Sequence, residues 1–255
     1  MIDLHALPLP DLHFTSWIIA ILAAVCIGLT KSGFGGFGVI AILLMAEIIP
    51  ARESTGAVLP MLIAADLMAI GSFHRHVAWK DFWKLLPTTF LGLCAGWFLM
   101  GRVPAAMFGH LLGWMVLAMM ALVLWQRFDR RVLSSITHHP LLASLSGFLA
   151  GVTTMVANAG GPAMTFYLLA RGLDKMAFVG TCAWFFFVTN LVKLPLSWSL
   201  GLITQKSLLL NALLLPAVAT GMLLGRYFLG KVPQGPFEWL LIVTATASAL
   251  KLILS

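Results

Sequence analysis

Long apolar stretches separated by short polar breaks run along the chain from about position 15 to its end. They predict ten helical elements, at 15–30, 37–49, 55–73, 85–100, 106–125, 141–157, 162–170, 177–196, 207–229 and 237–254. A helix needs about 20 residues to cross a hydrocarbon core roughly 30 Å thick, so 37–49 and 162–170 do not cross it comfortably. Each of these two follows a glycine-rich break, and we predict that each forms a re-entrant hairpin or a broken pair with the helix before it. The pattern predicts an all-α polytopic membrane protein with roughly eight to ten membrane elements.

The same pattern occurs twice along the chain. A Gly-x3-Gly-x4-Gly-basic-Val-Pro run begins at Gly92 and again at Gly221. We therefore predict one transmembrane domain over 1–255, with repeat 1 at about 15–125 and repeat 2 at about 141–254. Five elements per repeat is an odd number, so the second repeat should be inverted relative to the first.

Composition and charge support a lipid-facing surface. The chain is 60% hydrophobic and 10% charged, whereas a soluble domain carries about 25% charged residues. The net charge of +7 does not indicate nucleic acid, because no run of five or more basic residues occurs. Basic residues instead orient membrane proteins by gathering on the inner side. Placing both termini outside puts most of the 16 Lys and Arg residues inside, so we predict that orientation.

Two glycine-rich breaks, at 31–38 and 158–162, occupy matching places in the two halves. Paired interruptions in a duplicated membrane protein are typical of a transported substrate's site, and opened helix N-termini favour an anion. The alternative for the glycines is close helix packing, and for the threonines a bond back to their own helix. The candidate substrate-binding residues are Lys31, Ser32, Gly33, Gly35, Gly36, Thr153, Thr154, Asn158, Gly160, Gly161 and Asn190.

Two ionisable residues are candidates for ion or proton coupling. Asp66 lies well inside an apolar segment, where a carboxylate marks an ion path or forms a structural pair with Lys31 or another polar partner. Its repeat partner is Asn190, which is neutral. Lys193 lies on the same helix face as Asn190. It either faces the cavity or reaches outward from a helix end, and the second is favoured.

The breaks and the duplicated glycine run resemble the TauE/SafE family of sulfite and organosulfonate exporters. The matching residues run from Gly28 to Gly36 and from Gly151 to Pro162, and the likeness covers about 15–254. The resemblance implies a multi-pass carrier of small sulfur oxyanions or sulfonates in a bacterial inner membrane. One departure is that repeat 2 has Asn158 near the place of Lys31, so two symmetric anion sites are not implied.

The leading hypothesis is a secondary carrier that exports such an anion by alternating access. Proton-coupled uptake through Asp66 is the alternative. A metal-cation transporter or channel using His74, His76 and the 13 Met residues is less favoured, because those Met residues are scattered. No catalytic motif, metal site or cofactor site is indicated. The expected partners are the small anion and the lipid bilayer, with no nucleic acid, and the oligomeric state, including a homo-oligomer, stays open.

Overall fold

The structure, a computed structural model, describes residues 13–34, 37–49, 51–100 and 140–254, with the single positions 102, 114, 117 and 121. The predicted element at 106–125 therefore lies almost wholly outside the described residues. The described elements are α1 (Phe14–Lys31), α2 (Phe37–Ala46), α3 (Ala51–Ala57), α4 (Leu59–Phe73), the 3-10 turn η1 (His74–His76), α5 (Trp79–Met100), α8 (Pro140–Ala157), α9 (Gly161–Ala170), α10 (Lys175–Ser199), α11 (Gln205–Lys231) and α12 (Gln234–Leu254).

Outside 106–125, the described helices match the predicted elements apart from two differences. The stretch at 55–73 is divided at Val58 into α3 and α4, because Pro60 in the first turn of α4 has no N–H to continue the ladder. Helix α5 begins at Trp79 rather than 85, with Asp81 in its first turn. A carboxylate there is favoured by the helix dipole, which extends the helix into the polar segment.

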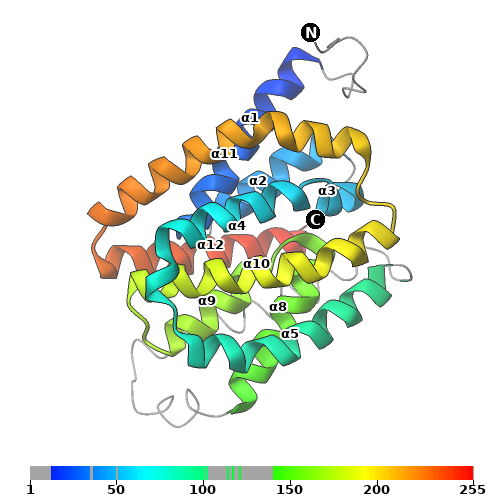
Figure 1. The fold of residues 1–255 in the computed structure, drawn as a ribbon. Coiled ribbons are helices and arrows are strands. Elements are labelled where there is room, and N and C mark those ends of the chain that lie inside the picture. Colours follow the sequence, from blue (N-terminus) through cyan, green and yellow to red (C-terminus); the bar gives the residue numbers. More distant parts are fainter. Residues whose placement is uncertain are drawn as a thin grey trace.

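Two central helices organise the bundle. Helices α4 and α10 pack against each other in the middle. The pair α1–α11 contacts α4 on one side, and the pair α5–α8 lies beyond α10 on the other (Figure 1). Helix α2 packs on α1, and α9 packs on α8 and α12. The chain thus builds its interior between the two central helices and the two broken pairs, α1–α2 and α8–α9.

Both outer pairs cross at glycines. Gly28 on α1 meets Gly221 on α11, and Gly151 on α8 meets Gly92 on α5; a Cβ at any of these four would lie within 2.2 Å of a backbone atom of the facing helix. Only glycine fits such crossings, where backbones approach closely and van der Waals contact holds membrane helices together. The packing is reciprocal, because the first helix of each half packs on the later helix of the other half. An inverted relation between the halves stays a prediction.

The outer surface suits a membrane. Five described segments are long and apolar enough to cross one, namely Phe14–Lys31, Glu53–His76, Trp79–Met100, Lys175–Ser199 and Gln205–Lys231. Helices α2 and α9 have 10 residues each, so each is about 15 Å long, half the core thickness. Large apolar side chains such as Leu91 and Leu223 are exposed on the outside.

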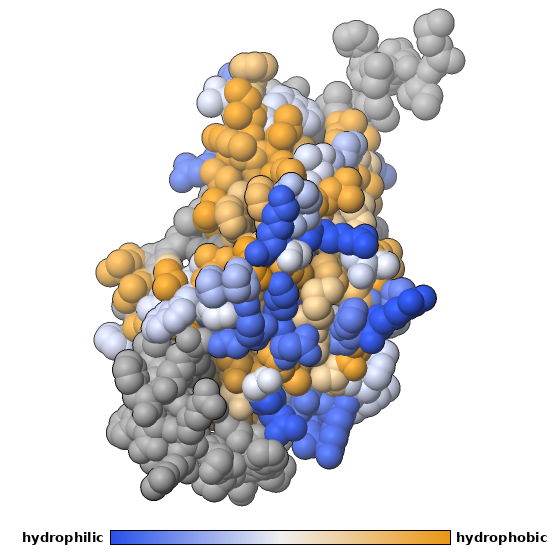
Figure 2. Space-filling view, turned by 90° about the vertical axis from the view of Figure 1, so that its left-hand side faces the viewer, coloured by the Kyte–Doolittle hydropathy of each residue, from blue (hydrophilic) through white to orange (hydrophobic). Residues whose placement is uncertain are grey.

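Polar side chains gather at one end of the bundle, where η1, the first turns of α5 and α10 and the last turn of α11 meet (Figures 1 and 2). At this end, Lys175 Nζ connects the start of α10 to the end of α11 by donating to the carbonyls of Leu229 and Val232 at 2.9 and 2.6 Å. The basic residues near this end are Arg75 in η1, Lys80 and Lys84 in the first two turns of α5, Arg171 after α9, Lys175 at the start of α10, and Arg226 and Lys231 in the last two turns of α11. All of them lie on the inner side in the orientation predicted from the sequence, and that this end faces the cell interior stays a prediction.

Candidate functional site

A cavity of about 130 Å³ lies between the two broken pairs and the central helices. One water needs about 10–15 Å³ of such space, so the cavity has room for a small anion with its contacts. Most of its wall is apolar. Its polar lining residues are Thr30, Lys31, Ser54, Thr55, Thr154, Asn158, Thr165, Asn190 and Thr244.

Both glycine-rich breaks reach this cavity. Gly33 and Gly38 of the first break line it, as do Gly161 and Pro162 of the second. No side chain caps the start of α9, and Pro162 has no N–H to satisfy. The start of α9 therefore lies beside the cavity with Gly161 N–H lacking a side-chain cap, and a helix N-terminus favours negative charge.

The chain leaves α1 and α8 through left-handed residues. Gly33 has φ +105° and Asn158 has φ +53°. Glycine adopts this region without cost, and asparagine is one of the few other residues that visit it. These conformations turn the chain sharply after each helix, so that α2 and α9 start beside the cavity instead of continuing across the membrane.

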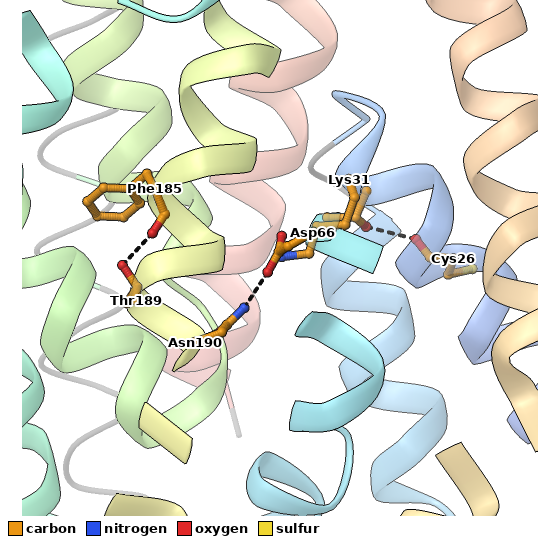
Figure 3. A network of polar contacts seen from close by, with 7 residues as sticks. Cys26, Lys31, Asp66, Phe185, Thr189 and Asn190 are labelled. Carbon is orange, nitrogen blue, oxygen red and sulfur yellow. Dashed lines mark hydrogen bonds and ion pairs between the residues drawn. The ribbon is translucent and has the colours of Figure 1, made fainter. Parts of the chain in front are cut away.

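Lys31, Asp66 and Asn190 form one polar network across the core (Figure 3). Lys31 Nζ lies 2.6 Å from Asp66 Oδ1, and Asn190 Nδ2 donates to Asp66 Oδ2 at 2.7 Å. Asp66 is fully buried. The structural pair between Asp66 and Lys31, one of the two readings left open by the sequence, is thus present. Lys31 and Asn190 line the cavity, so the network presents a cation and an amide to it.

Phe186 covers the same cation. Its ring centroid lies 4.8 Å from Lys31 Nζ, and Phe186 also lines the cavity. An aromatic face stabilises an ammonium group without neutralising it. Lys31 is therefore held in place by a carboxylate and a ring while part of its surroundings stays open to a ligand.

Lys193 does not reach outward, so the favoured sequence interpretation of this residue is wrong. Its side chain is fully buried, and Nζ donates to the carbonyl of Thr154 at 2.6 Å and to Asn158 Oδ1. Asn158 Nδ2 in turn donates to the carbonyl of Thr55 at 3.0 Å. The last carbonyls of α8 carry the negative end of the helix dipole and attract this cation inward.

Not all predicted residues face the cavity. The Ser32 hydroxyl donates to the carbonyls of Gly28 and Met222, each at 3.0 Å, and so faces α11. The Thr153 hydroxyl donates to the carbonyl of Leu149 at 2.7 Å, within its own helix. Gly160 packs between Thr154 and Phe186. Gly35 and Gly36 lie outside the described residues. The structure thus brings Lys31, Gly33, Thr154, Asn158, Gly161 and Asn190 together around one space.

Sequence reasoning missed several polar residues at this site. Ser54, Thr55, Thr165 and Thr244 line the cavity, yet each lies on a helix where a hydroxyl commonly bonds to the backbone instead. Thr30, directly before the first break, also lines the cavity, and its hydroxyl likewise donates to a carbonyl of its own helix, that of Cys26 at 2.8 Å. His74 and His76 of the weaker hypothesis are exposed in η1 at the polar end of the bundle.

A second ionic cluster, not predicted from the sequence, ties α9 to α5. Asp81 Oδ1 accepts from the Tyr167 hydroxyl at 2.7 Å and from Arg171 Nε at 2.8 Å. These contacts fix the far end of α9 at the polar end of the bundle. They position the short helix whose other end faces the cavity.

Among the comparisons with known proteins, a family model gave the match. The family model described as Sulfite exporter TauE/SafE matches residues 20–252, which include both breaks and both crossing pairs. No curated protein and no solved structure matches the chain. Together with five membrane-length segments, this match decides the class of protein. The chain belongs to the sulfite exporter TauE/SafE family, a family of membrane transporters, and is a multi-pass membrane protein.

Proposed function

We propose that this transporter exports a small sulfur-containing anion, a sulfite or an organosulfonate, which binds in the cavity between the two helix breaks. The observation that carries the proposal is that this cavity is lined by Lys31 and by the first turn of α9. An ammonium group and an uncapped helix N-terminus are both complementary to an anion. A sulfonate or sulfite group has several acceptor oxygens, which suits donors arriving from more than one side.

The reciprocal packing of the halves supports alternating access. Each broken pair is attached to a different outer helix pair, and α4 and α10 meet between them. In inverted-repeat carriers, access alternates when one unit rocks against the other around a fixed central site. We infer the same motion here, with the glycine crossings moving as rigid pairs and the cavity opening to one side at a time.

Export of a monoanion needs no coupled ion. Moving one negative charge out of a cell that is negative inside releases about 2.3 kcal/mol per 100 mV. Uptake would need another driving force, and Asp66 is the candidate proton carrier, because it pairs with the lysine that lines the cavity. An anion that takes Lys31 from Asp66 leaves a buried carboxylate that is stabilised by a proton.

The direct test measures sulfite and ethanesulfonate efflux from proteoliposomes containing the purified protein. An imposed potential, negative inside, should drive efflux without a pH gradient, and Lys31→Met should remove it. Gly71→Ala is the matched control, since Gly71 faces open space and this variant should transport normally. An anion flux that depends on the pH gradient and not on the membrane potential would contradict potential-driven export and favour proton-coupled uptake. Absence of any anion flux in the wild type contradicts both.

A labelling experiment locates the site. Cys182 lines the cavity, so a protein with Cys26→Ser and Cys94→Ser reports on this space alone. Sulfonatoethyl methanethiosulfonate carries the proposed cargo group and, with each rate divided by that reagent's rate with a free thiol, should modify Cys182 faster than the cationic trimethylammonioethyl reagent does. Ethanesulfonate should slow this reaction, and adding Cys182→Ser should abolish it. A faster reaction of the cationic reagent on this relative scale would contradict an anion site here.

A further inference from the structure

Three charged side chains lie inside the described core. They are Lys31, Asp66 and Lys193, and each is largely or fully buried. The other buried carboxylate, Asp81, pairs with Arg171 at the polar end of the bundle. Lys31 and Asp66 compensate each other across 2.6 Å. The charge balance of the core therefore depends on Lys193.

Lys193 is held by neutral groups. Its two acceptors are the carbonyl of Thr154 and the side-chain oxygen of Asn158. Among the acidic residues that the structure describes, none forms an ion pair with it. A cation without a counter-ion at this depth is costly and marks a functional site by default. The C-terminal dipole of α8 reduces the cost but supplies only about half an elementary charge.

The excess charge lies next to the cavity. Lys193 binds Thr154 and Asn158, and both of these residues line the cavity. Most of the remaining wall is apolar, with residues such as Ile42, Val179 and Phe186. In such surroundings screening is weak, so the charge of Lys193 acts on an anion that it does not touch. With Lys193 protonated, the three side chains Lys31, Asp66 and Lys193 together give the core one net positive charge.

We propose that Lys193 sets the charge of the cargo, so that the cavity selects monovalent anions over divalent ones. This inference rests on the function proposed above and adds the charge class of the substrate. A bound monoanion brings the total charge of Lys31, Asp66, Lys193 and the anion to zero. A dianion leaves one negative charge uncompensated in an apolar cavity, where it is not stabilised by water. Lys193 acts as a positioning and charge-balancing residue, and Lys31 is the group that faces the anion.

The test compares ethanesulfonate with ethanedisulfonate, which differ by one charged group. Binding to the purified wild-type protein is measured by calorimetry near neutral pH. The monoanion should bind about tenfold or more tightly than the dianion. Lys193→Met should weaken ethanesulfonate by about tenfold. Asp66→Asn, which adds one net positive charge with the same shape, should raise the affinity for ethanedisulfonate and reduce or reverse the preference.

The ratio of the two affinities separates charge from structure. A purely structural role of Lys193 would weaken both ligands equally and leave their ratio unchanged. If Lys193→Met fails to fold, Asp66→Asn alone still decides, because it changes the same charge balance from another helix. An unchanged ratio in the variants that fold overturns this inference and leaves the proposed function intact. Absence of any ethanesulfonate binding to the wild type overturns the proposed function itself.

Discussion

In each half of the chain one lysine connects the helix before the glycine-rich break to the central helix. In the first half this lysine lies on the helix before the break, and in the second half it lies on the central helix. In the first half Lys31 on α1 reaches Asp66 on α4. In the second half Lys193 on α10 reaches back to Thr154 on α8. The first connection is an ion pair, and the second binds a cation to neutral acceptors. The architecture is shared by the two halves, whereas the charges are not.

This difference distinguishes residues that serve helix packing, which match between the halves, from charged residues near the cavity, which do not. The glycine crossings Gly28–Gly221 and Gly151–Gly92 each join one half to the other and bring the two backbones equally close, because such contact tolerates no side chain. Asp66 and its counterpart Asn190 bind each other at the centre. One position carries charge and its partner does not, so the core avoids two like charges at that point.

The largest expected effect comes from removing Lys31, and it should exceed the effect of removing Lys193. Lys31→Met leaves Asp66 buried without a cation and should lower the free energy of unfolding by about 3–5 kcal/mol. Lys193→Met removes bonds to neutral oxygens and should cost only about 1–2 kcal/mol. Thermal unfolding of the purified proteins in detergent measures both. The double variant Lys31→Met/Asp66→Asn should recover most of the loss. A larger loss for Lys193→Met than for Lys31→Met would break the comparison.

The glycine crossings should respond equally in the two halves. Gly28→Ala and Gly151→Ala each place a methyl group 2.2 Å from a facing backbone oxygen, and overpacking of this kind costs about 1–3 kcal/mol. Gly71→Ala is the control, because nothing lies within 4 Å of its added Cβ. The unfolding midpoint of each variant is the measurement. A large loss at one crossing and none at the other would show that the halves do not pack alike.

The smallest expected effect concerns the left-handed turn at Asn158, where the chain leaves α8. Asn158→Gly and Asn158→Ala both remove the amide that bridges Lys193 and Thr55. Only Ala must hold the left-handed backbone with a Cβ, so it should be less stable than Gly by about 1–2 kcal/mol. Denaturant titration of the two variants measures this difference. Equal stabilities would mean that the turn after α8 changes its conformation when the amide is lost.

Much of the site was predictable, for reasons particular to each residue. Lys31, Asn158 and Gly161 lie at glycine-rich breaks, and a break in an apolar helix is visible without knowing its neighbours. Asp66 is visible because a carboxylate is rare in an apolar segment. Thr55 and Thr165 carry no such signal, because a threonine on a helix looks the same whether it faces a cavity or its own backbone.

The sequence by itself determined the helices, their breaks and the duplicated pattern, because apolar length, glycine and proline act locally along the chain. Only the tertiary structure decided where the side chains point. It turned Ser32 toward α11, drew Lys193 inward to the end of α8, and joined Asp66 to both Lys31 and Asn190. These contacts connect helices far apart in the sequence, and a buried charge takes whichever partner the packing brings within reach.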